Sequence, residues 1–270
     1  MRDDLLIKIC GITNEPDALL AVGLGADALG FILAPSPRQV APSAASDIVK
    51  RLPHDVLTVG VFRDEAPSRV VEIANTVGFG AVQLHGHESA EQCRWIRERV
   101  SCTIRAFRAG DRAIARFAEF GADYLLVDGQ SPGSGQVFDW RLAEGVVDPG
   151  RMFVSGGLTP ENVGDAIAAL RPRGVDVASG VEGAPGAKDP QRLRAFVRNA
   201  RAAAAAFSGA SGYGRVEHVG RVGHGELVGH AGPHAGPHAG GEGGDASTGA
   251  VTGAFPAGVP EEAPYDWMEG

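Results

Sequence analysis

The feature that most constrains this chain is a regular alternation of strand-like hydrophobic runs and helical patterns, which continues to about residue 207. Short runs rich in Ile, Leu, Val and Ala, bounded by Gly, Pro or Asp, predict strands. The expected strands cover residues 8–11, 28–33, 57–62, 81–85, 103–108, 123–128, 152–156 and 175–179. The expected helices cover residues 17–25, 43–52, 67–77, 90–100, 113–120, 139–145, 161–170 and 190–206. Each strand is thus followed by a helix, as parallel strands with crossover helices require.

The number of units favours a closed barrel over an open sheet. Eight strand–helix units in about 200 residues are typical of a compact (β/α)₈ TIM barrel. A doubly wound sheet is the alternative, but it usually has fewer strands, and no G-x-G-x-x-G fingerprint follows the first strand. We therefore expect an α/β fold with a (β/α)₈ barrel over residues 1–207.

The composition changes after this point. Residues 208–270 are rich in Gly, Ala, Pro and His and lack hydrophobic periodicity. A segment of this kind cannot bury enough hydrophobic surface to offset the entropy of ordering, so we expect a disordered tail whose partner is unknown. Five of the chain's 8 histidines fall here, but their spacing matches no closed metal site.

Charge and cysteine content narrow the function classes. The net charge of −8 provides no general attraction to nucleic acid or to an anionic membrane, so a local device must bind any anionic ligand. The 3 cysteines include no Cys-x-x-Cys pair, and a reducing cytoplasm fits them best. The first residues lack the basic charge of a signal peptide, and no run reaches the length of a membrane span.

In a barrel of this class, chemistry takes place at the C-terminal ends of the strands. Cys10 closes the first strand, and Lys8 has the same parity. The Lys8 ammonium could favour a Cys10 thiolate, or Lys8 could pair with a carboxylate deeper in the barrel; a buried core thiol is the plain alternative for Cys10. Asp128 closes the sixth strand, where partial burial would raise its pKa and suit a general acid; a helix cap is the alternative.

The loops after the last two strands suit a phosphate group. Gly156 and Gly157 follow the seventh strand, and Ser179 and Gly180 follow the eighth. Backbone N–H groups of such loops often form a phosphate cradle, for which glycine allows close approach. The alternative is a pair of ordinary tight turns.

Three further side chains are candidates for ligand contacts. Arg38 follows the second strand, and its planar guanidinium suits a ligand carboxylate, although a lone loop arginine is more often a solvated charge. Gln83 and His85 share one face of the fourth strand. His85 could polarise a substrate or be a satisfied structural histidine.

Taken together, these stretches resemble the phosphoribosylanthranilate isomerase family. The matching pieces occur in family order and cover residues 5–206. They include Lys8-Ile9-Cys10-Gly11-Ile12, Ser36-Pro37-Arg38, Val82-Gln83-Leu84-His85-Gly86, Gly133-Ser134-Gly135, Ser155-Gly156-Gly157-Leu158, Ser179-Gly180-Val181-Glu182 and Gly186-Ala187-Lys188-Asp189.

The resemblance implies a barrel enzyme of tryptophan biosynthesis that uses no metal and no cofactor. It places the general base on Cys10 and the general acid on Asp128, and it directs Arg38 to the anthranilate carboxylate. It also places the ribose phosphate at Gly156, Gly157, Ser179 and Gly180. The implied partner is a small phosphosugar substrate, and the reaction is an Amadori rearrangement.

Two departures from the family pattern and three alternatives remain. Pro132 stands where the family usually has Gly, which would stiffen the loop beside Asp128. Ala178 stands where Ser is common. The alternatives are another phosphosugar enzyme such as indole-3-glycerol phosphate synthase, a non-catalytic phosphate-binding barrel, and a second, histidine-pathway Amadori substrate.

Overall fold

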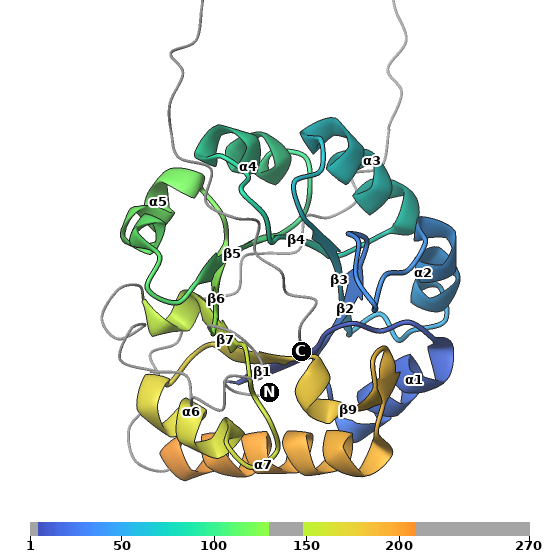
Figure 1. Cartoon of the computed structure of the whole chain (residues 1–270), viewed down its shortest axis with the longest axis vertical. Helices are drawn as coiled ribbons and strands as arrows, with labels where there is room; N and C mark the ends of the chain where they lie inside the picture. Colours follow the sequence, from blue (N-terminus) through green and yellow to red (C-terminus); the bar gives the residue numbers. More distant parts are fainter. Residues whose placement is uncertain (1–4, 130–147, 209–270) are drawn as a thin grey trace, which may run out of the picture. The chain divides into compact units, whose positions relative to one another are not determined.

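The structure is a computed structural model that describes residues 5–129 and 148–208. Eight parallel strands pair in sequence order, and β8 pairs with β1 to close a barrel (Figure 1). The strands are β1 Leu6–Ile9, β2 Ala28–Ile32, β3 Leu57–Phe62, β4 Ala81–Leu84, β5 Thr103–Arg108, β6 Tyr124–Asp128, β7 Met152–Ser155 and β8 Gly174–Val177. The closed barrel predicted from the alternating pattern is confirmed, and the open sheet is excluded.

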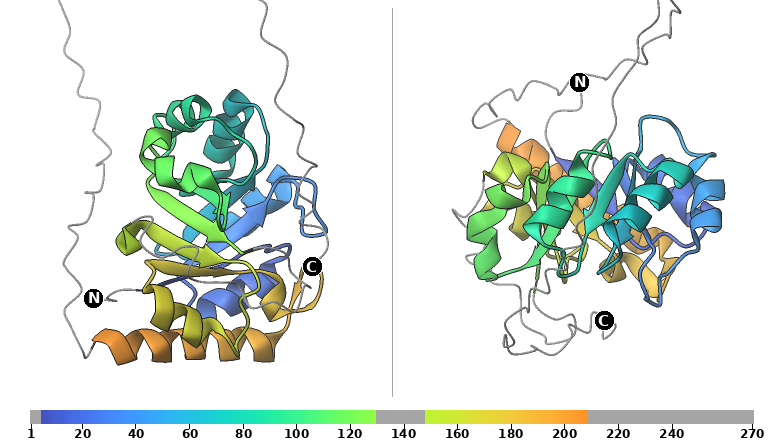
Figure 2. Two further views of the ribbon diagram at one scale, coloured as in Figure 1. Left: turned by 60° about the vertical axis from the view of Figure 1, so that its left-hand side comes forward. Right: turned by 90° about the horizontal axis from the view of Figure 1, so that it is seen from above.

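Helices surround the ring of strands on the outside (Figure 1). The α-helices are α1 Glu15–Leu24, α2 Pro42–Val49, α3 Pro67–Val77, α4 Ala90–Arg97, α5 Phe117–Phe120, α6 Val163–Leu170 and α7 Pro190–Ser208. Short 3₁₀ segments are η1 Arg112–Arg116, η3 Pro149–Arg151 and η4 Ser179–Val181, and a hairpin follows β8 with strands β9 Glu182–Ala184 and β10 Ala187–Lys188. Figure 2 shows α7 running along α6, and α7 also packs against α1. The expected helix over 139–145, Pro132, and the segment from residue 209 onward lie outside the described residues.

The structure corrects two of the predicted elements. The strand expected over 175–179 ends at Val177, because the chain turns into η4 at Ser179. The helix expected over 113–120 is split into η1 and the single turn α5. Asp111 caps the first piece by accepting from the Ala113 N–H, and Gly121, with φ of +66°, ends the second.

Local side chains define the ends of α1, which follows β1, and the start of α4, which follows β4. The Asn14 side chain accepts from the Asp17 N–H at the start of α1, and Gly25 ends that helix with φ of +102°. Ser89 and Gln92 form a reciprocal capping box at the start of α4. Because these caps are formed by residues close in sequence, the alternation of strands and helices could be predicted from the sequence.

The hydrophobic core has two parts. The outer part lies between the strands and the helices and includes Ile7, Leu84 and Phe196. The inner part fills the barrel and is made by Ala28, Val59, Ala81, Ile104, Ala106, Leu126 and Phe153. Because side chains fill the interior, a ligand can reach the barrel only at a mouth.

A buried ion pair holds the rim after β4. The Arg105 guanidinium donates to the carbonyls of Leu84 and Gly86 at 3.0 and 2.9 Å, and its Nη1 lies 3.3 Å from a Glu88 carboxylate oxygen. Glu88 in turn accepts from the Asp64 and Gly86 N–H groups at 2.9 Å. These bonds fix the backbone that follows His85.

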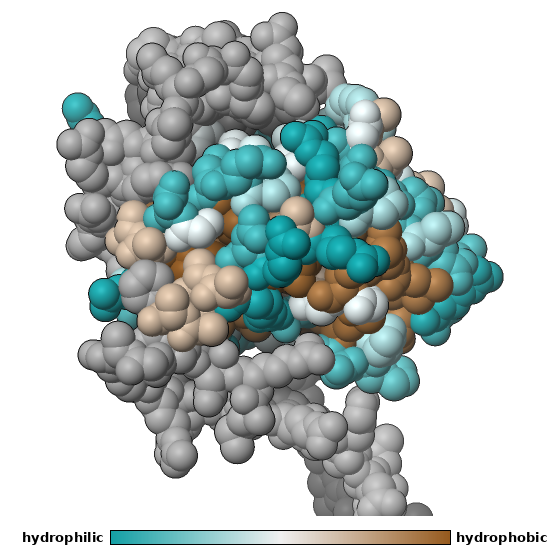
Figure 3. Space-filling view, turned by 90° about the horizontal axis from the view of Figure 1, so that it is seen from below, coloured by the Kyte–Doolittle hydropathy of each residue, from teal (hydrophilic) through white to brown (hydrophobic). Residues whose placement is uncertain are grey.

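The outer surface is mixed. Seen from below, hydrophobic areas lie between hydrophilic ones (Figure 3), and Leu19 on α1 is 44% exposed. The outer helix faces lie away from the C-terminal ends of the strands, so we assign this surface no part in the site. None of the helices that the structure describes combines the length and hydrophobicity needed to cross a bilayer.

Candidate active site

Cys10 and Asp128 both lie at the C-terminal mouth of the barrel. Cys10 directly follows β1, where its N–H donates to the Val177 carbonyl at 2.8 Å. Asp128 is the last residue of β6. The shorter way round the ring from β6 to β1 passes through β7 and β8, so the two residues stand apart across the mouth. An acid and a base that act on two sides of one substrate require this placement.

Cys10 is nearly enclosed. It is 6% exposed and belongs to a small hydrophobic cluster with Ile32, Ala34 and Val61. A Cβ at Gly30 would lie 2.7 Å from Cys10 Sγ, so glycine there makes room for the thiol. Burial raises the pKa of Cys10, and the Lys8 ammonium lowers it by less than burial raises it. The thiol is therefore neutral in the ligand-free protein at neutral pH.

Lys8 pairs with Asp176 inside the barrel and also lies beside Cys10, so the two roles left open by its parity are both present. Register places Lys8 opposite Asp176 where β1 and β8 close the ring, and the Nζ–Oδ1 distance is 2.9 Å. Burial lowers the pKa of Lys8, but the charge of Asp176 and the neighbouring Cys10 more than offset it, so the pKa is raised. Lys8 is thus a buried cation beside the thiol.

Asp128 is linked to Gln83 through His85. His85 Nε2 lies 3.3 Å from Asp128 Oδ2, and Gln83 Nε2 lies 2.9 Å from His85 Nδ1. The predicted shared face of Gln83 and His85 is confirmed. With Gln83 donating to Nδ1, a neutral His85 carries its proton on Nε2 and donates it to the carboxylate. The chain of contacts orients the Asp128 carboxyl group.

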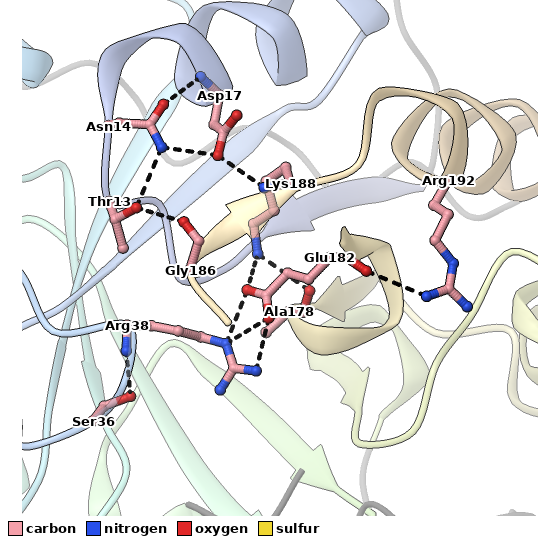
Figure 4. A network of polar contacts seen from close by, with 10 residues as sticks. All are labelled: Thr13, Asn14, Asp17, Ser36, Arg38, Ala178, Glu182, Gly186, Lys188 and Arg192. Carbon is pink, nitrogen blue, oxygen red and sulfur yellow. Dashed lines mark hydrogen bonds and ion pairs between the residues drawn. The ribbon is translucent and has the colours of Figure 1, made fainter. Parts of the chain in front are cut away.

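Arg38 is a buried ion-pair member, and the reading of it as a solvated loop charge is wrong. It is 5% exposed, and its guanidinium donates to the Glu182 carboxylate through Nε and Nη2 (Figure 4). Lys188 Nζ donates to the same carboxylate at 2.8 Å. The Arg38 stem passes close to Gly11, where a Cβ would lie 2.7 Å from Arg38 Cδ. Arg38 is therefore held at the mouth by residues that follow β8.

The glycine-containing loops after β7 and β8 lie close to each other and to Asp128. Gly156 and Gly157 have φ of +83° and +66°. A Cβ at Gly156 would lie 2.2 Å from the Gly129 nitrogen, and one at Gly180 would lie 1.8 Å from the Leu158 carbonyl oxygen. These contacts demand glycine, and they bring the backbone at Gly156, Gly157, Ser179 and Gly180 to one side of the mouth, where N–H groups can bind an anion.

Replacing Gly156 by Ala is expected to lower turnover by about 100-fold and to reduce stability by about 1–3 kcal/mol. The new Cβ would meet the Gly129 backbone and the Asp128 carboxylate, so the acid and the adjacent loop would both move. Steady-state kinetics and urea unfolding measure the two effects. Gly78→Ala, at a position of similar φ with no atom within 4 Å of a new Cβ, is the matched control and should lose stability but not activity.

Sequence reasoning missed two residues of this site. Glu182 and Lys188 were quoted as motif members without a role, although two charged residues in a Gly-rich turn after the last strand were the available signal. Cys93 and Cys102 lie in hydrophobic clusters away from this site. Among the described residues, no group of three or more His, Cys, Asp or Glu side chains is placed to bind a metal ion. The role of Pro132 stays untested because it lies outside the described residues.

Comparison with known proteins identifies the family of the chain. A family model for N-(5'-phosphoribosyl)anthranilate (PRA) isomerase matches residues 7–199. An N-(5'-phosphoribosyl)anthranilate isomerase of Desulforudis audaxviator is 50% identical over 205 residues, which cover 73% of this chain and 98% of that protein.

Solved structures match over the same region. The crystal structure of phosphoribosyl anthranilate isomerase from Thermotoga maritima has a TM-score of 0.68 and 42% identity, covering 73% of this chain and 99% of that one. A crystal structure of such an isomerase in complex with reduced 1-(o-carboxyphenylamino)-1-deoxyribulose 5-phosphate has a TM-score of 0.65, 42% identity and the same coverage. Because the family model matches residues 7–199 and a relative is 50% identical, the chain belongs to the phosphoribosylanthranilate isomerase family.

Proposed function

We propose that Cys10 and Asp128 are the base and the acid of the reaction that this chain catalyses. By its family, the chain is a phosphoribosylanthranilate isomerase of tryptophan biosynthesis. The reaction is an Amadori rearrangement, which converts an aminoaldose phosphate into an aminoketose phosphate. The observation that carries the residue assignment is the position of the two groups at the ends of β1 and β6, on two sides of one mouth.

The reaction begins with proton donation. Asp128 protonates the furanose ring oxygen, the ring C1′–O bond breaks, and the nitrogen lone pair forms an imine conjugated with the aromatic ring. His85, held by Gln83, keeps the Asp128 carboxyl group oriented for this transfer. In this proposal Gln83, on β4, and His85, directly after that strand, also contact the substrate.

The second step removes the proton at C2′. Cys10 takes this proton in its thiolate form, which is the minor form at neutral pH and arises when the thiol releases its own proton to solvent. An enolamine is left, and it tautomerises to the ketone. Lys8 stabilises the thiolate because its ammonium lowers the pKa of Cys10. Burial raises the same pKa and has the larger effect. The buried Asp176 keeps Lys8 charged in a site from which water is largely excluded.

Binding groups surround the reacting atoms. We assign the ribose phosphate to the N–H groups around Gly156, Gly157, Ser179 and Gly180, and the anthranilate carboxylate to Arg38. In a solved isomerase, the reduced product analogue carries both groups. No metal or cofactor has a step in this scheme, and a cytoplasmic location and a tail from residue 208 remain predictions.

The activity test follows the loss of fluorescence of freshly prepared phosphoribosylanthranilate with the purified full chain. Rapid loss, unchanged by a chelator, is expected with the natural sequence, because no step needs a metal. Persistent fluorescence with a folded protein would instead indicate a binding barrel. Turnover of the histidine-pathway aminoaldose in a parallel assay would add a second Amadori substrate.

A further inference from the structure

A buried carboxylate lies between two cations at the mouth of the barrel. The Glu182 oxygens accept from Arg38 Nε at 2.9 and 3.0 Å and from Arg38 Nη2 at 2.8 Å. On the other side, Lys188 Nζ donates to Glu182 at 2.8 Å and to the Ala178 carbonyl at 3.1 Å (Figure 4). The side chains of all three charged residues are at most 6% exposed. Removing three charged groups from water costs desolvation free energy, so burial of these charges indicates a role other than keeping the protein soluble.

The hairpin after β8 places this carboxylate. Glu182 starts β9 and Lys188 ends β10, and the two residues face each other in the register of the hairpin. Asp17 of α1 accepts from the Lys188 N–H at 2.9 Å, and Thr13 Oγ1 donates to the Gly186 carbonyl at 2.6 Å. The hairpin is thereby bonded to the loop that carries Cys10, so the position of Glu182 is set before any ligand binds.

The charges and the geometry favour one task. Burial raises the pKa of Glu182, but hydrogen bonds from Arg38 and the charge of Lys188 outweigh this and hold the pKa below its usual value. Burial lowers the pKa of Lys188, and the Glu182 carboxylate opposes this. With Arg38 and Lys188 both protonated, the cluster carries two positive charges and one negative charge, a net charge of +1. Glu182 takes the Nε–Nη2 edge of the guanidinium and so fixes its plane, and a ligand carboxylate would bind the edge formed by the two terminal nitrogens.

We propose that Glu182 is a positioning residue that aims Arg38 at the carboxylate of the aromatic amine, and so makes the enzyme specific for a carboxylated substrate. This inference rests on the proposed role of Arg38 in the isomerase reaction. Lys188 supports Glu182 from the side opposite Arg38, so that the carboxylate does not turn away. Without Glu182, Arg38 loses the hydrogen bonds that fix the Nε–Nη2 edge and the plane of its guanidinium.

The test compares two substrates in the full chain, phosphoribosylanthranilate and the phosphoribosyl derivative of aniline, which lacks the carboxylate. Glu182→Gln is expected to lower kcat/KM for the carboxylated substrate about 10- to 100-fold, mainly through KM, and for the aniline derivative less than about 3-fold. Glu72→Gln, on the exposed face of α3, is the matched control and should change neither value. A merely structural role of Glu182 would lower both values equally.

A double variant completes the test. Arg38→Met should abolish the preference for the carboxylated substrate, and Arg38→Met with Glu182→Gln should be no more impaired than Arg38→Met alone. If Glu182→Gln does not fold, Glu182→Gln with Lys188→Met, which removes both partners of the second buried pair, takes its place. An unchanged preference in a folded Glu182 variant overturns the inference.

Assays of the wild-type protein distinguish a failure of the Glu182 inference from a failure of the proposed function. Turnover of neither substrate would contradict the isomerase activity itself. Equal turnover of both would remove Arg38 from carboxylate recognition, and with it the role of Glu182.

Discussion

Asp128→Asn is expected to lower kcat by about 1,000-fold or more while the barrel stays folded. The amide keeps the shape of the carboxyl group and can still contact His85, which lies 3.3 Å from the carboxylate, but it has no acidic proton to give to the ring oxygen. Because the lost contribution is made in the transition state, KM should change little. Steady-state kinetics by anthranilate-type fluorescence, with circular dichroism on the same samples, measure both parts.

Cys10→Ala is expected to have an effect of similar size for a different reason. In the proposed mechanism the Cys10 thiolate is the base for the C2′ proton, and its small hydrophobic surroundings tolerate alanine, so the fold should survive. Cys102→Ala is the matched control, since that thiol lies near the other end of the barrel, where it precedes β5, and burial raises its pKa to about 12. Near-normal turnover of purified Asp128→Asn or Cys10→Ala would remove that residue from the mechanism.

Lys8→Met has the largest expected effect on stability. It leaves the Asp176 carboxylate, whose side chain is 5% exposed, without its partner at 2.9 Å, and breaking a buried pair in this way costs about 3–5 kcal/mol. Urea unfolding measures the loss. Lys8→Met with Asp176→Leu removes both charges and should recover most of it, whereas a double variant as unstable as the single one would contradict the ion-pair explanation.

Lys8 and Asp176 are also expected to shift the pKa of Cys10 in opposite directions. Burial raises the pKa of Cys10 above the ordinary 9.0, the Lys8 charge lowers it, and the Asp176 charge raises it. Thiolate should therefore appear only at alkaline pH. Lys8→Met should move the midpoint to higher pH, and Asp176→Asn should move it to lower pH.

The difference in thiolate absorbance between each protein and its Cys10→Ala derivative reports this titration. Cys93 and Cys102 cancel in that difference. Midpoints that move in the same direction in the two variants would show that the charges act through a change of structure.

The placement of a site residue could be predicted from the sequence where it depends on the pattern of a single strand. Gln83 and His85 were placed on one face by the period of two residues, and the structure brings their nitrogens within 2.9 Å. Cys10 and Asp128 were placed at strand ends by the same local reasoning. In each case the observation needs only the periodicity of one strand and the rule that parallel strands end at one rim.

The contacts between distant segments could not be predicted in this way. The sequence left a solvated loop charge open as the alternative for Arg38, because its partner, Glu182, lies 144 positions away and meets it only through the hairpin after β8. Gly180, just after the end of β8, lies so close to the Leu158 carbonyl that a Cβ there would clash, and no local propensity records a contact between these two loops.

What the sequence by itself determined is the barrel and the placement of Cys10 and Asp128 at the ends of strands, because hydrophobic period, helix caps and strand ends are local properties of the chain. What only the tertiary structure decided is the electrostatic setting of those groups. Lys8 meets Asp176 because closure of the ring sets β1 beside β8 in one register. Arg38 meets Glu182 because the hairpin after β8 is bonded to the loop after β1. Charges buried by such closure depend on distances across the fold, and these do not exist until the strands have closed into a ring.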